Sequence, residues 1–134
     1  MEDKKPNDLN ETIFFKDNRG GGDTHLRRGY LTVIHGGGSI LGRSVVVEDS
    51  ITAGRDASCD LVLLDPGVSR RHIKVSRGGE NSYLLEDLNS TNGTALNEQP
   101  VARAVELREG DKIFAGDTVL RFSIADEMDL GFQR

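Results

Sequence analysis

The sequence predicts an all-β fold, specifically an antiparallel β-sandwich of about ten to eleven short strands, and three observations indicate it. Short apolar or β-branched runs follow one another at intervals of about 8–12 residues. Turn-forming pairs such as Asn92-Gly93 separate many of them. No segment shows the sustained 3.6-residue apolar period of an amphipathic helix. A closed small barrel is the structural alternative.

The first half of the expected sandwich consists of apolar runs separated by glycines. The expected strands of this half are residues 30–34, 44–47, 51–53 and 61–64. The first two are rich in Val, Ile and Thr, whose branched side chains pack well on a pleated sheet. Gly36, Gly37, Gly38 and Gly42 lie between these two runs and supply the conformational freedom that a turn requires.

The second half contains the clearest strand pattern and two further turns. The expected strands of this half are residues 72–76, 82–87, 105–107, 112–115 and 118–124. Ile73 and Val75 alternate with polar neighbours, which is the period-two pattern of a half-buried strand. Gly110 and Gly116 are each followed by aspartate, and these pairs predict the turns before the last two strands.

Length and composition exclude several classes of protein. The chain has 134 residues, which fits one ordinary domain. No apolar run approaches the roughly 18 residues that a membrane-spanning helix requires. The first residues contain no apolar stretch, so we expect no secretory signal peptide. Cys59 is the single cysteine, which excludes an internal disulfide and a Cys-based zinc site. We therefore expect a cytoplasmic protein.

The chain divides into three parts by composition. Residues 1–29 are predicted to be a flexible tail, residues 30–125 the folded domain, and residues 126–134 a linker or chain end. The tail contains one apolar cluster, Ile13-Phe14-Phe15, among polar residues and glycines. This cluster either packs on the domain or belongs to a docking motif.

The charge distribution bears on the kind of ligand. The net charge is −5, from 17 basic and 22 acidic residues, which argues against binding of nucleic acid. Five basic residues nevertheless fall between positions 55 and 77: Arg55, Arg70, Arg71, Lys74 and Arg77. They either recognise a small anionic ligand or are scattered over a solvated surface.

Catalysis and metal binding are not expected. Ser69, His72 and Asp87 contain the side chains of a hydrolase triad, but Ser69 and His72 are close in sequence and nothing indicates an oxyanion hole. The histidines at 25, 35 and 72 lack the spacing of paired metal ligands. No glycine cluster leads into the Gly-Lys-Ser/Thr of a phosphate-binding loop. We predict a non-enzyme with no cofactor and no metal.

Three short segments, in this order and at these spacings, carry a resemblance to a known family. The segments are Gly54-Arg55, Val68-Ser69-Arg70-Arg71-His72 and Leu88-Asn89-Ser90-Thr91-Asn92-Gly93-Thr94. Together they resemble the forkhead-associated (FHA) domain, a phosphothreonine-binding β-sandwich of the SMAD/FHA type. The resemblance extends from about Tyr30 to Ile124. One departure is Ala53, where the family usually has a larger aliphatic residue.

The resemblance implies a phosphothreonine site. Arg55 and Ser69 are then expected to bind phosphate oxygens, and Thr91 to add a hydroxyl or backbone contact. Arg70 is expected to supply a second cation or a backbone N–H, and Asn92 to bond the peptide backbone. Arginine and hydroxyl donors suit a doubly charged phosphate ester.

Three further residues of the motif are interpreted as support for the site. Gly54 and Gly93 meet backbone requirements, either a close approach or a positive φ. His72 is expected to brace the second loop by hydrogen bonding. Arg71 and Lys74 are either solvated strand residues or part of a positive rim.

The tail contains a candidate phosphosite, Thr12, with the apolar Phe15 three residues later. Discrimination in the family depends largely on that third position. A flexible chain from Thr12 to Tyr30 has a root-mean-square span of roughly 24 Å. This span exceeds the radius of about 13 Å expected for a domain of this size. We therefore predict that an upstream Ser/Thr kinase modifies Thr12 and that the tail then binds its own domain or a neighbour's.

The predicted function is phosphothreonine-dependent protein–protein recognition. The partner is a phosphothreonine-containing peptide or protein, with no nucleic acid and no membrane. The resemblance suggests the N-terminal regulatory domain of a larger bacterial signalling protein, for example one with a diguanylate cyclase output. The alternative is a phosphorylation-independent scaffold that uses a sheet face for assembly.

Overall fold

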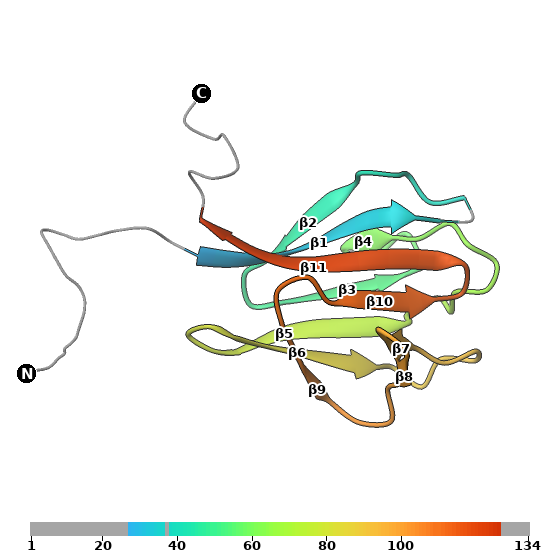
Figure 1. The fold of residues 1–134 in the computed structure, drawn as a ribbon. Coiled ribbons are helices and arrows are strands. Elements are labelled where there is room, and N and C mark those ends of the chain that lie inside the picture. The colour runs from blue at the N-terminus through green and yellow to red at the C-terminus, as the bar shows by residue number, and fades with distance from the viewer. Residues whose placement is uncertain (1–26, 37, 127–134) are drawn as a thin grey trace, which may run out of the picture. The chain divides into compact units, whose positions relative to one another are not determined.

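Eleven strands in two facing sheets make up the described part of the chain, residues 27–36 and 38–126 of the computed structural model (Figure 1). In chain order the strands are β1 (Arg27–His35), β2 (Ser44–Val47), β3 (Ser50–Gly54), β4 (Leu61–Val62), β5 (Ile73–Gly79), β6 (Ser82–Asp87), β7 (Ala95–Leu96), β8 (Gln99–Pro100), β9 (Val105–Leu107), β10 (Lys112–Ala115) and β11 (Thr118–Asp126). The predicted all-β sandwich is confirmed. Within these ranges no helix is long and apolar enough to span a membrane.

Each sheet contains strands from both halves of the chain. The six-stranded sheet has the order β2-β1-β11-β10-β7-β8, and the five-stranded sheet has the order β4-β3-β5-β6-β9. The pairs β3–β5, β5–β6 and β10–β11 are antiparallel, as predicted. Strand β4 departs from the antiparallel expectation because it pairs parallel to β3, with Ala53 opposite Leu61.

The core lies between the sheets. Apolar residues alternate along the strands, and the side chains on the inner faces form this core. In β10, Ile113 and Ala115 are buried whereas Phe114 faces outward. The largest fully buried side chains are Tyr83 and Phe122, whose ring centroids lie 5.2 Å apart in a tilted arrangement. Tyr83 meets the hydrogen-bonding requirement of its buried hydroxyl by accepting a 2.9 Å bond from the Gly29 N–H.

The predicted strand positions agree with the structure apart from their ends and one hairpin. Strand β1 begins three residues before Tyr30, and β11 runs two residues beyond Ile124. The predicted run 61–64 is a strand only over its first two residues. Gly110 and Gly116 occupy the two predicted turns with φ of +87° and +59°.

The hairpin of β7 and β8 was not predicted. Each strand has two residues, too few to display a period, and Pro100 argues against a strand away from a sheet edge. β8 is an edge strand, where proline is tolerated. Asn97 turns the chain between the two strands with φ of +57°. The candidate phosphosite Thr12 and the cluster Ile13-Phe14-Phe15 lie outside the described residues.

Candidate functional site

Three loops carry the residues singled out from the sequence. The loops are residues 55–60 between β3 and β4, residues 63–72 between β4 and β5, and residues 88–94 between β6 and β7. Backbone hydrogen bonds join the first two loops. The Arg55 N–H donates to the Ser69 carbonyl and the Asp56 N–H to the Arg70 carbonyl, each at 3.0 Å. Arg55 and Ser69 are therefore neighbours despite their separation in sequence.

Gly54, the last residue of β3, lies against the backbone of the second loop. A Cβ atom added at Gly54 would stand 2.2 Å from the Arg70 carbonyl oxygen, well inside any permitted contact. The φ of Gly54 is not positive, so the close approach rather than the backbone conformation requires glycine here. The glycine thus lets the backbone of Arg55 and Asp56 bond directly to the second loop.

The Arg55 guanidinium is oriented by the second loop. Its Nε donates to the Val68 carbonyl at 2.8 Å, which uses one of the five N–H donors of arginine. Among the described residues, its two terminal nitrogens have no protein acceptor. Arg55 is exposed, so these nitrogens can bind an anion with paired, nearly parallel hydrogen bonds.

The Ser69 hydroxyl joins the second loop to the third. Its Oγ accepts a 3.0 Å hydrogen bond from the Thr91 N–H. Because the oxygen acts as acceptor in this bond, the hydroxyl hydrogen remains able to donate to a ligand. The structure therefore brings together Arg55, Ser69 and Thr91, one from each loop, as exposed or partly exposed hydrogen-bond donors.

His72 is fully buried and braces both loops. Its Nδ1 accepts from the Ser69 N–H at 2.9 Å, and its Nε2 lies 2.9 Å from the Gly93 carbonyl. These two bonds assign the neutral tautomer with the hydrogen on Nε2, which donates to Gly93. His72 bonds to the backbone of Ser69 and not to its hydroxyl, so this geometry does not activate the serine as a nucleophile.

The third loop is fixed by Asp87, at the end of β6. Its carboxylate accepts from the Ser90 N–H at 3.0 Å and the Ser90 hydroxyl at 2.6 Å, and also from the Thr94 hydroxyl. Burial acts to raise the pKa of Asp87, but the hydrogen bonds from Ser90 and Thr94 outweigh it and hold the pKa below its ordinary value. Gly93, near the end of the loop, has a φ of +87°.

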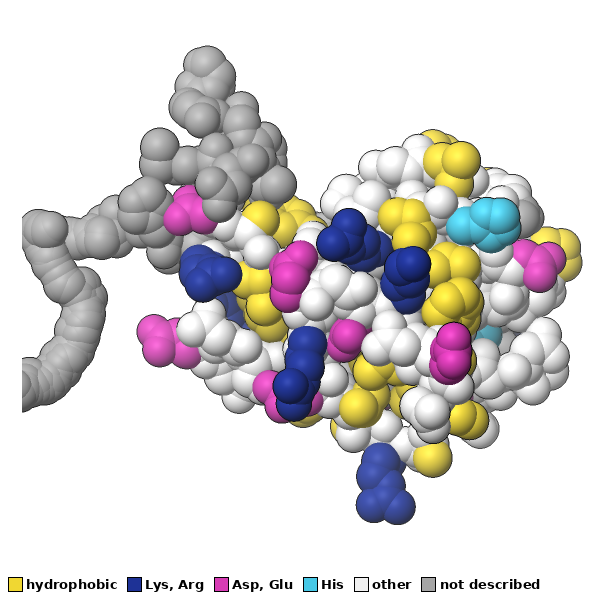
Figure 2. Space-filling view, viewed as in Figure 1, with side chains coloured by type: hydrophobic (Ala, Val, Ile, Leu, Met, Phe, Trp, Pro, Cys, Tyr) yellow, Lys and Arg dark blue, Asp and Glu magenta, His cyan; other side chains and the backbone are white. Residues whose placement is uncertain are grey.

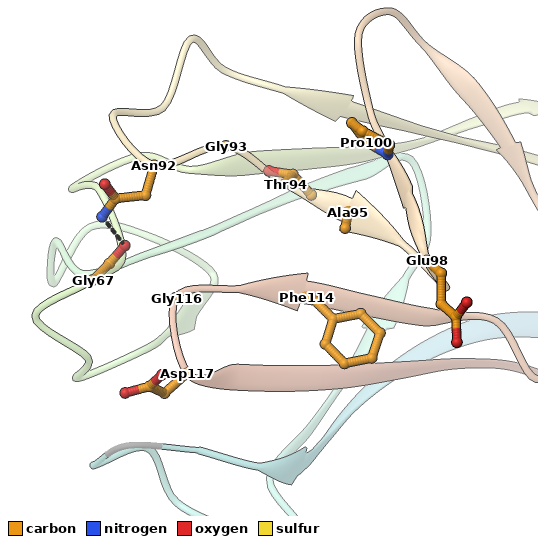
Figure 3. A pocket seen from close by; sticks show the side chains of 10 residues that line it. All are labelled: Gly67, Asn92, Gly93, Thr94, Ala95, Glu98, Pro100, Phe114, Gly116 and Asp117. Atoms are coloured by element: carbon orange, nitrogen blue, oxygen red, sulfur yellow. Dashed lines mark hydrogen bonds between the residues drawn. The ribbon is translucent and has the colours of Figure 1, made fainter.

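Asn92 is linked to the second loop through its side chain. Its Nδ2 donates to the Gly67 carbonyl at 3.0 Å (Figure 3). The amide has a second N–H and a carbonyl oxygen, which supply the donor and acceptor needed to bond an extended peptide backbone.

Asp65 positions Gly67 and was not identified from the sequence. It is 1% exposed, and its carboxylate accepts 2.8 Å bonds from the N–H of Gly67, the N–H of Asp117 and the hydroxyl of Thr118. Burial acts to raise its pKa, but these bonds prevail and lower it. The Asp65-Pro66-Gly67 sequence is a turn signal that could have indicated a carboxylate bonded two residues ahead.

The other basic residues singled out from the sequence are Arg70, Arg71 and Lys74. Arg70 and Arg71 are exposed, and both lie near enough to Asp56 to act on its carboxylate. Hydrogen bonds from the Ser58 hydroxyl and N–H are the main cause that lowers the pKa of Asp56, with Arg70 and Arg71 adding to it. Lys74 is half-buried in β5, between Thr52 and Glu86 of the neighbouring strands.

Comparison with known proteins identifies the class to which this fold and site belong. The family model described as FHA domain matches residues 51–116, which contain all three loops. The structure aligns with that of the FhaA FHA domain complexed with the intracellular domain of Rv3910. The TM-score is 0.61 and the identity 37%, covering 70% of this chain and 98% of that one. The chain belongs to the FHA family.

A second solved structure and two curated relatives agree. The structure comes from a study of phosphothreonine-dependent FHA domain interactions, with 35% identity, a TM-score of 0.64, and coverage of 73% of this chain and 97% of that one. The oxoglutarate dehydrogenase inhibitor of Corynebacterium jeikeium is 36% identical over 69% of this chain, and FhaA of Mycobacterium tuberculosis is 45% identical over 52%. The chain spans 62% and 13% of the lengths of these two relatives, respectively.

Proposed function

We propose that this chain recognises phosphothreonine in a peptide or protein partner, in a phosphorylation-dependent and non-catalytic manner. The observation that carries the proposal is the meeting of three donors from three loops. The terminal nitrogens of Arg55, the hydroxyl of Ser69 and the hydroxyl of Thr91 have no acceptor in the described part of the chain. A phosphate monoester supplies close to two negative charges and strong acceptor oxygens, which matches this set.

The supporting hydrogen bonds make the arrangement suitable for recognition. His72 and Asp87 fix the backbone of the second and third loops, so these loops lose little backbone freedom when a ligand binds. Asn92 is assigned to the peptide backbone beside the phosphothreonine, and Arg70 to a second positive charge near the phosphate. The name of one relative, the oxoglutarate dehydrogenase inhibitor, supports a regulatory, non-enzymatic role.

Removal of the Arg55 guanidinium tests the proposal. A phosphothreonine peptide selected from a degenerate library is titrated into the wild-type chain and the Arg55→Ala variant by calorimetry. Loss of a hydrogen bond to a charged group costs about 1.5–3 kcal/mol, so the affinity should fall about 10- to 150-fold.

Arg108→Ala is the matched control for this experiment. Arg108 is an exposed arginine between β9 and β10, at the other end of β10 from the Gly116 turn. The control removes the same charge and should leave the affinity unchanged. If both variants bind like the wild type, Arg55 does not hold the phosphate and the proposed site is wrong. If the unphosphorylated peptide binds equally well, the chain is a phosphorylation-independent scaffold and the proposed function is wrong.

We also propose a source for the ligand, the chain's own segment around Thr12. The support comes from the sequence, in which Phe15 follows Thr12 by three residues and the intervening chain is long enough to reach the domain. The peptide of residues 8–18 should bind when a Ser/Thr kinase has phosphorylated Thr12 and not otherwise. Equal binding of both forms, or of neither, would contradict it. Attachment to an output domain such as a diguanylate cyclase stays a prediction.

A further inference from the structure

A groove of about 560 Å³ adjoins the third loop on the outer face of the six-stranded sheet. It is bounded by Asn92 and Gly67 at one end and by Glu98 in the β7–β8 turn at the other (Figure 3). Between these ends lie Ala95 and Phe114. The groove is therefore continuous with the residue assigned to the peptide backbone.

The floor of the groove is an apolar row that crosses three strands. Pro100 in β8 is the register partner of Ala95 in β7, and Ala95 is the partner of Phe114 in β10. Directly opposed residues point to the same side of a sheet, so the three side chains form one continuous strip. Phe114 is 37% exposed and is one of the few large apolar side chains left at the described surface. The strip can bury the apolar part of a ligand side chain.

The charged groups of the groove are both acidic. Glu98 and Asp117 line it, and neither forms an ion pair with a cation of the described residues. Glu98 and Phe114 line the same groove, and in Figure 3 Glu98 lies at the end of the groove formed by the β7–β8 turn, whereas Asp117 lies at the opposite end. A long side chain lying on Phe114 therefore extends along a groove that has the Glu98 carboxylate at one end.

We propose that this groove selects a basic side chain in the phosphopeptide, at a position flanking the phosphothreonine; the inference rests on the proposed function. The methylene stem of a lysine or arginine lies on Phe114 and Ala95, and its charged head reaches Glu98. The aromatic face adds a favourable interaction with the cation. An acidic side chain at the same position is repelled by Glu98. The chain thus favours peptides that carry a negative phosphate at one place and a positive side chain at another.

The test combines peptide and protein variants. Phosphothreonine peptides that differ only by Lys, Leu or Glu at each flanking position are titrated into the wild type and into Glu98→Lys. At one flanking position the wild type should prefer Lys over Glu by about three- to fivefold, as expected for one partly exposed ion pair. Glu98→Lys should reverse that order. Glu98 is exposed in a turn, so folding should be retained.

Two controls separate the groove from the rest of the molecule. Glu106→Lys changes an exposed residue of β9 in the other sheet by the same charge and should keep the wild-type order. Phe114→Ala should weaken the binding of both the Lys and the Leu peptide. If binding still requires phosphate but Glu98→Lys leaves the order unchanged, the groove proposal is overturned and the proposed function stands. If unphosphorylated peptides bind equally well, both fail.

Discussion

At the scale of single residues, Ser69 makes three separate contacts that define the site. Its carbonyl accepts from the Arg55 N–H, its own N–H donates to His72, and its hydroxyl accepts from the Thr91 N–H. Each contact fixes a different neighbour. Ser69 and His72 are joined through the serine backbone N–H and the Nδ1 of the histidine ring, and not through the serine hydroxyl that a catalytic triad would use. The sequence alone does not show which atom of each residue takes part.

Gly54 permits a direct prediction about stability. Gly54→Ala would place a Cβ atom 2.2 Å from the Arg70 carbonyl, and both groups belong to backbone that cannot move independently. Overpacking of this kind typically costs about 1–3 kcal/mol or more. Urea unfolding should show that loss. In Gly79→Ala, the control, the new Cβ meets its nearest neighbour at 3.8 Å, and the stability should barely change. Equal effects of the two variants would contradict the explanation.

At the scale of elements, alternation and turn residues predicted most of the strands and all three loops. The contacts that hold the loops were less accessible. Asp65 bonds to residues more than 50 positions later in the chain, which no local pattern reveals. The β7–β8 hairpin is too short to show a period, and its pairing with β10 depends on the whole sheet. The sequence did not indicate Glu98 as a groove residue for the same reason, because Glu98 belongs to that hairpin.

Because carboxylates hold the loops in place, we expect the free energy of unfolding to fall at acidic pH. The folded state holds the pKa of Asp65 below the ordinary 3.8, so the unfolded state takes up protons first as the pH falls. Stability therefore rises with pH in this range. The contribution is fully present above about pH 4 and is lost as the pH falls through the lowered pKa.

Urea unfolding between pH 3 and pH 6 measures this effect. Asp65→Asn should lower the free energy of unfolding by about 1.5–3 kcal/mol at pH 6, because donors lose a charged acceptor. Its stability should also depend less steeply on pH below 4. Asp60→Asn changes a carboxylate in an exposed position, where it accepts from Thr52, and serves for comparison. If the free energy of unfolding of Asp65→Asn falls below pH 4 as steeply as that of the wild type, the role given to Asp65 is contradicted.

At the scale of the whole molecule, the distribution of charged side chains favours a small anionic ligand over a polyanion. Basic and acidic side chains are interspersed on the face shown in Figure 2, so that face has no extended basic surface of the kind that polyanions require. The two sheets bring loops from distant parts of the chain to one place, with β3, β5 and β6 adjacent in one sheet. The fold supplies the rigid support, and local loop chemistry supplies the ligand specificity.

The predicted division into tail, domain and chain end leads to an experiment at this scale. Strands β1 and β11 begin and end at Arg27 and Asp126, so we propose that residues 27–126 contain everything needed for folding and phosphopeptide binding. This fragment should unfold at the same urea midpoint as the full chain and bind an unrelated phosphothreonine peptide at least as tightly. A lower midpoint would show that residues outside these limits stabilise the domain.

The account depends most on the meeting of three loops at one phosphate, and a nuclear magnetic resonance titration measures this directly. The 15N-labelled chain is titrated with a phosphothreonine peptide and with its unphosphorylated form. The phosphorylated peptide should shift the Arg55 Nε–H signal and the backbone amides of Ser69, Thr91 and Asn92, while the unphosphorylated peptide leaves them in place. Shifts confined to an outer sheet face, or identical shifts with both peptides, would contradict the account.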